Sequence, residues 1–374
     1  MSKTSITIIT DRFYTSNHAS VIRIKSFADA LFKSKNYKIK ILTSKKGVYH
    51  DKYNSHLSFL NPPDNKNSFF FRFFKEVLFS LELSIRLIFI KTDYVFISSP
   101  PFIMSLFCSL ISFIKRKPYI LDIRDLYPEV FFSAEVLSHN SSLGKILKFL
   151  EHKIYQNSIF TISTTNTWVD KISKSQKKAF LIRNGFINSL IPTASEKYPI
   201  FTVLFHGNLG IFQNIELLIK IANRFNDSDV KIKFLVVGSG SKAPLLKNTN
   251  IEFIGHRSLN DIYKLISKCH LGISFRTKED LSIGAIPVKI YEYISMRIPV
   301  VIVPKGEAGD LIESLGMGYQ FNPNQYEEIF FKINEVLNDF RNGNKSSSYD
   351  NKLIESFNRS LIANNFVKLL NDNI

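Results

Sequence analysis

Cysteine and long apolar runs are scarce in this chain of 374 residues. The two cysteines, Cys108 and Cys269, each lie in an apolar run, and no Cys-x-x-Cys pair occurs. This excludes a disulfide framework and a structural zinc site, and it fits a reducing cytoplasm. A charged segment followed by an apolar one does not precede the strand-like run at residues 5–10. We therefore expect no secretory signal.

A segment long enough to cross a bilayer is also missing. The longest apolar stretch covers residues 100–114 and is ended by Lys115, Arg116 and Lys117. A transmembrane helix needs about 20 apolar residues, so a buried helix is the better interpretation. We expect a cytoplasmic protein that is peripheral on the inner face of the cytoplasmic membrane and does not span it.

Positive charge is abundant and unevenly distributed. Residues 1–190 carry 28 Lys and Arg against 13 Asp and Glu, whereas residues 191–374 carry 21 against 19. A codon bias towards lysine would affect both halves equally. A field of one sign on one domain attracts an anionic partner. The anionic membrane surface is the favoured partner of this half, nucleic acid is not expected, and the absence of any partner is the remaining alternative.

Short apolar runs alternate with longer helical patterns along the whole chain. This alternation predicts parallel sheets with right-handed crossovers, an α/β architecture. The candidate strands are residues 5–10, 38–43, 94–98, 119–123, 159–163 and 179–183 in the first half, and 201–206, 231–237, 251–253, 271–274, 300–303 and 318–321 in the second.

The alternation restarts near residue 200, after a polar linker at residues 190–197. The sequence therefore predicts an N-terminal domain over residues 1–190 and a C-terminal domain over residues 200–350. Each is expected to be a doubly wound, Rossmann-like parallel sheet, and the two are expected to face each other across a cleft. A C-terminal helix over residues 351–374 is able to pack back on the first domain.

Residues 68–90 form a helical pattern with phenylalanine crowded at one end and basic residues beside it. Such a helix can lie in a bilayer interface. It can equally pack on the sheet of the first domain. Both interpretations stay open, and the basic excess of this half favours some membrane contact.

The most informative segment surrounds a helical pattern at residues 288–296. Pro287 is favoured at a helix start, and the free N–H groups from Val288 onwards form an anion site. Lys289 places a cation in the first turn, next to the positive end of the helix dipole. This arrangement is unfavourable unless an anion is bound there. Glu292 can accept hydrogen bonds from a sugar diol. The alternative is a surface helix with a Lys/Glu pair at i and i+3.

The run Pro-x-Lys-x-x-Glu-Tyr-x-x-x-x-x-Pro-Val-Val that starts at Pro287 resembles the donor-site motif of family 4 glycosyltransferases, which are retaining enzymes with the GT-B fold. Five other segments are similar to family segments in the same order. Residues 122–129 most resemble the corresponding segment of the subgroup that builds O-antigen and capsule, which includes N-acetyl-fucosamine transferases. The five segments are residues 122–129, 183–185, 205–214, 236–240 and 254–256.

The resemblance implies a hexosyl- or N-acetylaminosugar transferase that retains the anomeric configuration. The implied donor is a UDP-sugar such as UDP-N-acetyl-fucosamine, bound by the C-terminal domain. The implied acceptor is a lipid-linked (undecaprenyl diphosphate) saccharide of O-antigen or capsular polysaccharide synthesis, bound by the N-terminal domain. No metal ion and no other cofactor is expected.

Donor contacts are implied at nine positions. Glu292 is expected at the nucleotide ribose, and Gly284 stands eight positions earlier, where relatives often have another glutamate. Relatives also carry an arginine and a lysine near the first glycine loop, which this chain lacks before Lys220. Arg276 and Lys278 are possible substitutes. The expected donor-binding residues are Gly207, Asn208, Gly238, Gly240, Arg276, Pro287, Val288, Lys289 and Glu292.

In the first domain, His18, Arg124 and Asp125 are the candidate catalytic residues. Each follows a predicted strand, and loops at the carboxyl ends of parallel strands bind the ligands of α/β proteins. His18 can otherwise be a solvated loop residue, and Arg124 and Asp125 can form a simple ion pair.

Two other functions remain as alternatives. A nucleotide-sugar epimerase can have the same GT-B fold. A non-enzymatic nucleic-acid-binding protein would fit the basic charge, but the aromatic strings and zinc spacings of the common modules are missing. A dinucleotide site at residues 238–243 is disfavoured because that fingerprint needs an acidic residue at the end of the next strand, whereas Glu252 comes too early and the strand ends in Gly255 and His256.

Overall fold

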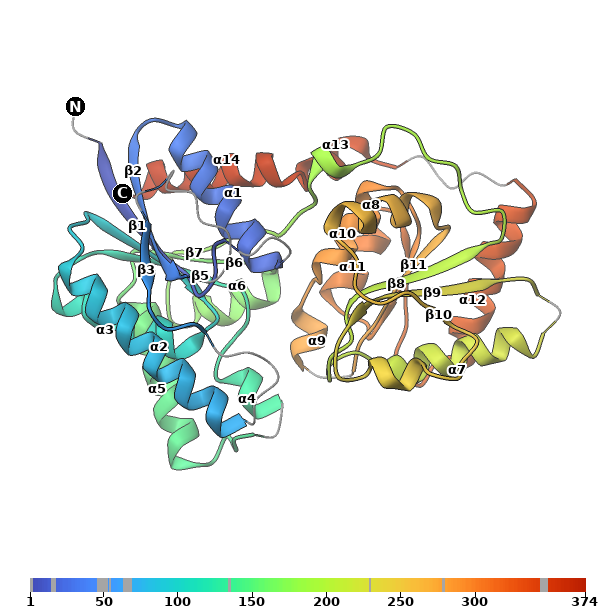
Figure 1. The fold of residues 1–374 in the computed structure, drawn as a ribbon, viewed down its shortest axis with the longest axis horizontal. Coiled ribbons are helices and arrows are strands. Elements are labelled where there is room, and N and C mark those ends of the chain that lie inside the picture. The colour runs from blue at the N-terminus through green and yellow to red at the C-terminus, as the bar shows by residue number, and fades with distance from the viewer. Residues whose placement is uncertain are drawn as a thin grey trace. The chain divides into compact units, whose positions relative to one another are not determined.

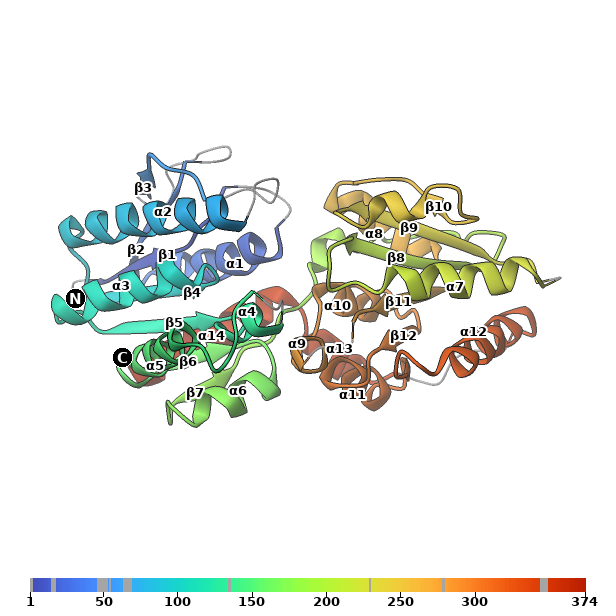
Figure 2. The same cartoon turned by 90° about the horizontal axis from the view of Figure 1, so that it is seen from below.

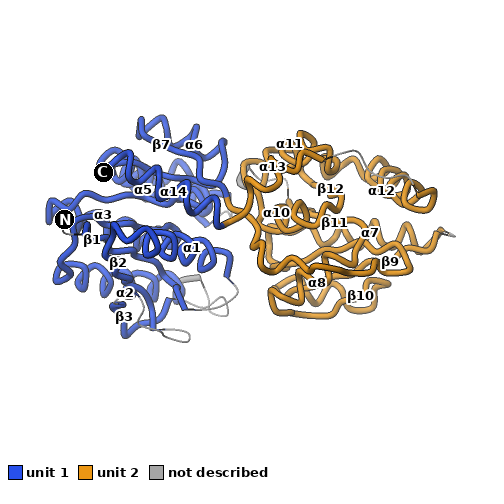
Figure 3. The backbone as a smooth tube through the Cα atoms, turned by 90° about the horizontal axis from the view of Figure 1, so that it is seen from above, with its two compact units in different colours: residues 1–183, 360–374 blue, residues 184–359 orange. Residues whose placement is uncertain are grey.

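The computed structural model describes residues 3–14, 18–45, 53, 55–62, 69–133, 136–228, 230–277, 280–343 and 349–374. The chain forms two compact units, residues 1–183 with 360–374 and residues 184–359 (Figure 3). The second unit thus begins before the linker that the sequence indicated. The expected helix 351–374 is two helices, α13 (Asn351–Ser356) in unit 2 and α14 (Arg359–Asn373), which lies almost entirely in unit 1.

Unit 1 contains a seven-stranded parallel sheet with the order β3-β2-β1-β4-β5-β6-β7. The six strands expected in this half are present with ends shifted by two residues or fewer. β3 was not expected, because its sequence Ser-His-Leu-Ser has no apolar run. The strands are β1 (Thr4–Ile9), β2 (Tyr37–Ser44), β3 (Ser55–Ser58), β4 (Tyr94–Ser99), β5 (Tyr119–Ile123), β6 (Thr161–Ser163) and β7 (Ala179–Leu181).

Helices cover both faces of this sheet. α2 and α3 pack side by side on one face with α5 next to α3, and α1 and α14 cover the other face (Figures 1 and 2). Phe366 of α14 stacks on Phe27 of α1 with ring centroids 4.4 Å apart, which fixes the C-terminal helix in the core of unit 1. The helices are α1 (Ala19–Lys33), α2 (Phe69–Phe89), α3 (Phe102–Ile114), α4 (Glu129–Ser133), α5 (Ser142–Gln156) and α6 (Asn166–Ser173).

A buried ion pair links α1 to the centre of the unit 1 sheet. The Arg23 guanidinium donates to both carboxylate oxygens of Asp122 on β5, with the shortest distance 2.9 Å, and both side chains are fully buried. Arg23 also donates to the carbonyl oxygen of Arg183. A buried charge is tolerated only when it is paired and hydrogen-bonded in this way. Asp122 is therefore a structural residue.

Unit 2 contains a six-stranded parallel sheet with the order β10-β9-β8-β11-β12-β13, and this confirms the predicted α/β fold of two parallel sheets. The strands are β8 (Thr202–Asn208), β9 (Lys233–Ser239), β10 (Glu252–Phe253), β11 (Leu271–Phe275), β12 (Val300–Val303) and β13 (Gly318–Gln320). The helices are α7 (Ile215–Asn226), α8 (Leu259–Lys268), α9 (Asp280–Gly284), α10 (Val288–Ser295), α11 (Glu307–Ser314) and α12 (Tyr326–Arg341), with short 3-10 helices at η1 (Asn188–Leu190) and η2 (Ala243–Leu246).

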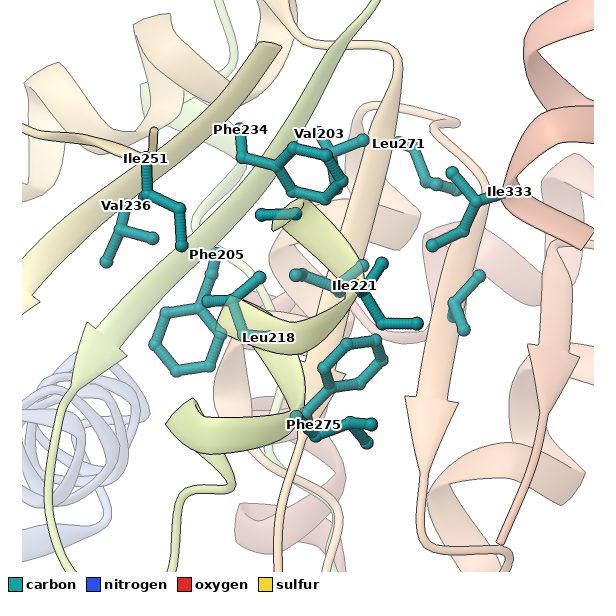
Figure 4. Packing of buried hydrophobic residues seen from close by; sticks show 14 of the residues in the cluster. Val203, Phe205, Leu218, Ile221, Phe234, Val236, Ile251, Leu271, Phe275 and Ile333 are labelled. Carbon is teal, nitrogen blue, oxygen red and sulfur yellow. The ribbon is translucent and has the colours of Figure 1, made fainter. Parts of the chain in front are cut away.

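Apolar side chains from both faces fill the core of unit 2. On the face shown in Figure 4, Phe205 of β8 and Phe275 of β11 pack against Leu218 and Ile221 of α7, and Ile333 of α12 closes this layer. On the opposite face, α8, α10, α11 and α13 contribute a second buried cluster. The central strands β8, β9, β11 and β12 are buried on both faces over most of their length, which explains their continuous apolar sequences.

Each sheet has one point where the strand order reverses, between β1 and β4 in unit 1 and between β8 and β11 in unit 2. In open α/β sheets, ligands bind outside the carboxyl ends of the strands at this point. The fold therefore directs the search to the residues that follow β1 and β4, and to those that follow β8 and β11.

Candidate active site

Helix α10 begins beside the carboxyl ends of β8 and β11. Pro287 is its N-cap, with extended backbone angles (φ −60°, ψ 144°), so the first turn starts where the sequence predicted. Tyr293 anchors the helix, because its hydroxyl donates to the carbonyl oxygen of Leu204 at 2.8 Å. Its ring lies against Gly272, where an added Cβ would approach it to 2.7 Å. These contacts hold α10 against β8 and β11.

Lys289 lies in this first turn and is only 8% exposed. Its Nζ is 3.8 Å from the centre of the Phe205 ring, and it has no hydrogen-bond partner among the described residues. Gly207 leaves space beside it, since a Cβ there would lie 3.7 Å from Nζ. Burial and the nearby charge of Arg276 lower the pKa of Lys289 to about 7, against the opposing effect of Glu292. An anion would supply the missing partner.

Glu292 lies one turn further along α10 and is 7% exposed. Burial raises the pKa of its carboxyl group to about 7, while the charges of Arg359 and Lys289 act in the opposite direction. Since Lys289 and Glu292 are both buried, the alternative of a solvent-exposed Lys/Glu pair is wrong.

His206, on β8, is the neighbour of Glu292. Its Nε2 lies 3.4 Å from Glu292 Oε2. Burial and the charge of Lys289 keep the pKa of His206 well below its ordinary value, so the ring is neutral at pH 7. Neither His206 nor Arg359 was a candidate from the sequence. The family resemblance included residues 205–214, which contain His206, whereas no motif marks Arg359.

The two glycine loops have a packing role that the sequence did not indicate. Gly207 pairs with Gly238 across β8 and β9, and a Cβ on Gly238 would lie 1.9 Å from the carbonyl oxygen of Gly207. A Cβ on Gly240 would lie 2.4 Å from the carbonyl oxygen of Leu209. Both glycines have positive φ (152° and 156°), which other residues rarely adopt. The glycines therefore allow two backbone segments to touch.

The Gly238 N–H already donates to the carbonyl oxygen of Gly255 at 2.9 Å. It is therefore not free to hold a phosphate, which argues against the dinucleotide fingerprint. Asn208, at the end of β8, is exposed to solvent.

Arg276 follows β11 directly. Its backbone N–H donates to the carbonyl oxygen of Val303 at 2.8 Å. Its backbone also forms an isolated antiparallel β-bridge with Gln213, in the loop after β8. Its charge contributes to the lowered pKa of Lys289, so the two cations lie near each other. Lys278, the other candidate cation, lies outside the described residues. The structure thus brings Gly207, Arg276, Lys289 and Glu292 together at the reversal point of the unit 2 sheet.

The three candidates in unit 1 follow two strands: His18 comes after β1, and Arg124 and Asp125 come directly after β5. His18 is the N-cap residue of α1 and is exposed, its Nδ1 is 3.2 Å from Ser20 Oγ, and partial desolvation together with the charge of Arg12 lowers its pKa. Arg124 donates from its guanidinium to the carbonyl oxygen of Pro100 at 2.8 Å. Asp125 is exposed and forms no ion pair with Arg124, so the simple ion-pair alternative is wrong.

Two acidic residues that the sequence did not single out lie near these candidates. Asp11 follows β1, and its Oδ1 is buried without a hydrogen-bond partner among the described residues. Burial raises the pKa of Asp11, although the charges of Arg124, Arg12 and His18 oppose the shift. Glu76 of α2 accepts a hydrogen bond from the Ile103 N–H, and burial raises its pKa to about 7, with the charge of Asp11 adding to the shift. No motif marks either position.

Comparison with known proteins supports a glycosyltransferase. Residues 200–339 match the family model described as Glycosyl transferases group 1. The chain is similar to a protein of Pseudomonas aeruginosa named probable glycosyltransferase WbjE, with 21% identity over 301 residues and 74% of each chain covered.

Solved structures show the same two-unit fold. HepE of Anabaena, solved with UDP-glucose, superposes with a TM-score of 0.71 at 14% identity, over 98% of this chain and 99% of that one. The lipopolysaccharide outer core galactosyltransferase WaaB superposes with a TM-score of 0.63 at 13% identity, over 99% and 100%. The chain therefore has the GT-B fold, and its second unit carries the group 1 glycosyltransferase sequence pattern.

Proposed function

We propose that this protein transfers a sugar from a UDP-sugar to a lipid-linked saccharide during synthesis of a bacterial surface polysaccharide, with retention of the anomeric configuration. The observation that carries the proposal is the buried ammonium of Lys289, which has no hydrogen-bond partner among the described residues and lies in the first turn of α10. An N-acetylaminosugar such as N-acetyl-fucosamine is the proposed group to be transferred.

The donor diphosphate binds at the start of α10. The N–H groups of Val288 and Lys289 and the Lys289 ammonium provide hydrogen bonds and positive charge at one point, whereas the Ile290 N–H already donates to the carbonyl oxygen of Pro287. Arg276 adds a second cation to the same region. When the sugar–phosphate bond breaks, negative charge grows on the diphosphate, and donors fixed in advance stabilise it. These residues therefore act on the leaving group, and Gly207 provides the space that a phosphate oxygen needs.

The ribose of the nucleotide binds at Glu292. An ionised carboxylate can accept hydrogen bonds from two adjacent hydroxyl groups, and hydrogen bonds to a charged group are stronger than neutral ones. His206 stays neutral beside Glu292 and adds no competing charge. The pair thus holds the nucleoside while Lys289 holds the diphosphate.

The acceptor saccharide binds at the carboxyl ends of β1 and β5. His18, Arg124 and Asp125 remain the proposed contacts there, and we add Asp11. The Oδ1 of Asp11 is a buried acceptor without a partner among the described residues, and it can receive a hydrogen bond from a sugar hydroxyl group. The lipid part of the acceptor would keep the enzyme at the cytoplasmic face of the membrane. No helix in the described part of the chain is long and apolar enough to cross a bilayer.

Thermal unfolding with UDP-, GDP- and dTDP-sugars tests the donor class, because a ligand that binds the native state raises its stability. We expect UDP-sugars to raise the midpoint most. Incubation of the protein with the stabilising sugar nucleotide alone then separates a transferase from an epimerase. Formation of an epimer without any acceptor would overturn the proposal. A gel shift with nucleic acid at physiological salt, without any donor-induced stabilisation, would do the same.

A further inference from the structure

A groove lies at the amino-terminal edge of the unit 1 sheet, away from the strand ends that carry the candidate acceptor residues. Its volume is about 580 Å³. It is lined by the starts of β1 and β2, by the end of α2 and by the residues after α3. The lining residues are Ser5, Lys38, Lys40, Ile88, Phe89, Ile90, Lys91, Thr92, Asp93, Lys115 and Lys117.

Five lysines and one carboxylate line this groove. The carboxylate, Asp93, already accepts a hydrogen bond from the Ser5 N–H at 2.8 Å. The Lys40 ammonium donates to the carbonyl oxygen of Lys91, and the Lys115 ammonium donates to that of Ile88. Backbone carbonyls thus hold two of the cations in the groove although their charges repel. Burial and the charges of Lys38 and Lys91 lower the pKa of Lys40, while Asp93 opposes this shift.

Apolar side chains stand exposed beside the lysines. Phe89 lines the groove and is 80% exposed. Phe113 and Ile114, at the end of α3, are 61% and 64% exposed. They directly precede Lys115, and α3 packs along α2 (Figure 2). Exposed aromatic and aliphatic side chains next to clustered lysines are typical of a surface that meets an anionic bilayer.

We propose that this lysine groove binds the phosphate head group of an anionic phospholipid, with Phe89, Phe113 and Ile114 inserted among the acyl chains. A free anion would use the lysines but not the exposed apolar groups. Nucleic acid would leave Phe113 and Ile114 in water. The lipid uses both features. The proposal goes beyond the transfer reaction, because the groove is formed by residues other than the proposed donor and acceptor contacts.

Flotation of the full chain with vesicles tests this site. We expect the protein to float with vesicles of phosphatidylcholine and phosphatidylglycerol, to float poorly with phosphatidylcholine alone, and to dissociate at high salt. Each lysine at an anionic surface contributes about fivefold to binding. The fourfold variant Lys38→Gln, Lys40→Gln, Lys115→Gln and Lys117→Gln should therefore bind at least about 50-fold more weakly.

A matched variant controls for total charge. Lys171→Gln, Lys174→Gln, Lys177→Gln and Lys178→Gln remove the same charge from exposed positions at α6 and the segment before β7. We expect this variant to bind vesicles within about threefold of the natural protein, because its lysines lie outside the groove. Equal losses in the two variants would show that only net charge matters and would overturn the proposal.

Substitution of the exposed phenylalanines tests the insertion into the acyl chains separately. Phe89→Ser with Phe113→Ser should weaken vesicle binding at least about tenfold, whereas Phe331→Ser, at an exposed position in unit 2, should leave it unchanged. Unchanged binding of the double variant, together with stabilisation by inorganic phosphate alone, would identify the groove as a free-anion site and contradict the proposal. Stabilisation by UDP-sugars is measured on every variant, so a failed membrane proposal is distinguished from a failed donor proposal.

Discussion

The two units have similar parallel sheets, but the edges at which we propose that donor and acceptor bind are built by different means. In unit 2, glycines bring backbone segments into close contact, and the short helix α10 carries both Lys289 and Glu292. Closely packed backbone therefore positions the two side chains. In unit 1, charged side chains cluster around the ends of β1 and β5, and Arg23 with Asp122 forms a fully buried ion pair beneath them.

The difference fits the two kinds of ligand proposed above. A nucleoside diphosphate has a fixed shape and charge, so a preorganised backbone site suits it. A saccharide offers hydroxyl groups in many orientations, and side chains with unused hydrogen-bonding capacity suit it better. We therefore expect changes in unit 2 to alter donor affinity, and changes in unit 1 to alter either stability or acceptor use.

The largest effect is expected when the buried ion pair of unit 1 is broken. Arg23→Met leaves the Asp122 carboxylate buried without its cation, which should lower the free energy of unfolding by about 3–5 kcal/mol. Denaturant unfolding measures the loss. The double variant Arg23→Met with Asp122→Leu is the control, since it removes both charges and should recover much of the stability. A loss below about 1 kcal/mol in the single variant would mean that the pair behaves like a surface pair.

Donor binding should depend most on Glu292. Glu292→Ala removes the acceptor of two ribose hydrogen bonds, each contributing about 1.5–3 kcal/mol, so UDP affinity should fall at least about 100-fold. Titration calorimetry with UDP measures this. Glu328→Ala, in the first turn of α12, is the matched control and should bind UDP normally. Near-normal affinity in Glu292→Ala would remove this residue from the donor site.

The pH dependence of UDP affinity should show a maximum near pH 7. The diphosphate needs Lys289 protonated, and with a pKa of about 7 its charge is lost as the pH rises above 7. The ribose needs Glu292 ionised, and with a pKa of about 7 that charge is lost as the pH falls below 7. Affinity should fall up to about tenfold per pH unit on either side. In Lys289→Met, the alkaline decline should disappear, and a decline that persists would assign it to another group.

The same two groups act on stability in opposite directions. The pKa of Lys289 is lowered on folding, so the unfolded state binds more protons between pH 7 and pH 10.5, and stability rises with pH in that range. The pKa of Glu292 is raised, so the folded state binds more protons between pH 4.5 and pH 7, and stability falls as the pH rises there. Without an anion, Lys289→Met should therefore raise stability at and below pH 7.

The smallest effect should come from Asp11. Asp11→Asn keeps the shape but removes a charge whose burial is unfavourable, so thermal stability at pH 7 should rise slightly. UDP affinity should stay within about twofold, while transfer to acceptor should fall about tenfold through the loss of one charged hydrogen bond. Asp170→Asn, at an exposed position of α6, is the control. Loss of UDP affinity in Asp11→Asn would break the proposed division of roles between the units.

Much of the fold follows from the sequence, because buried parallel strands need continuous apolar runs and the helices between them need longer amphipathic ones. Twelve of the thirteen strands in the part of the chain that the structure describes could be predicted in this way. β3 could not, since a short edge strand with a polar sequence lacks that signal. The helix expected over residues 351–374 is two helices, and α14 belongs to unit 1, where Phe366 stacks on Phe27.

The sequence by itself determined the start of α10 at Pro287 and the presence of Lys289 and Glu292 one turn apart, because local capping and spacing are encoded in adjacent residues. Only the tertiary structure decided that both side chains are buried, that His206 lies beside Glu292, and that the glycines bring β8 and β9 together. Burial raises the pKa of Asp11 and of Glu76, and for Glu76 the charge of Asp11 adds to the shift. Burial and charge proximity arise between residues far apart in the chain, and no local pattern records them.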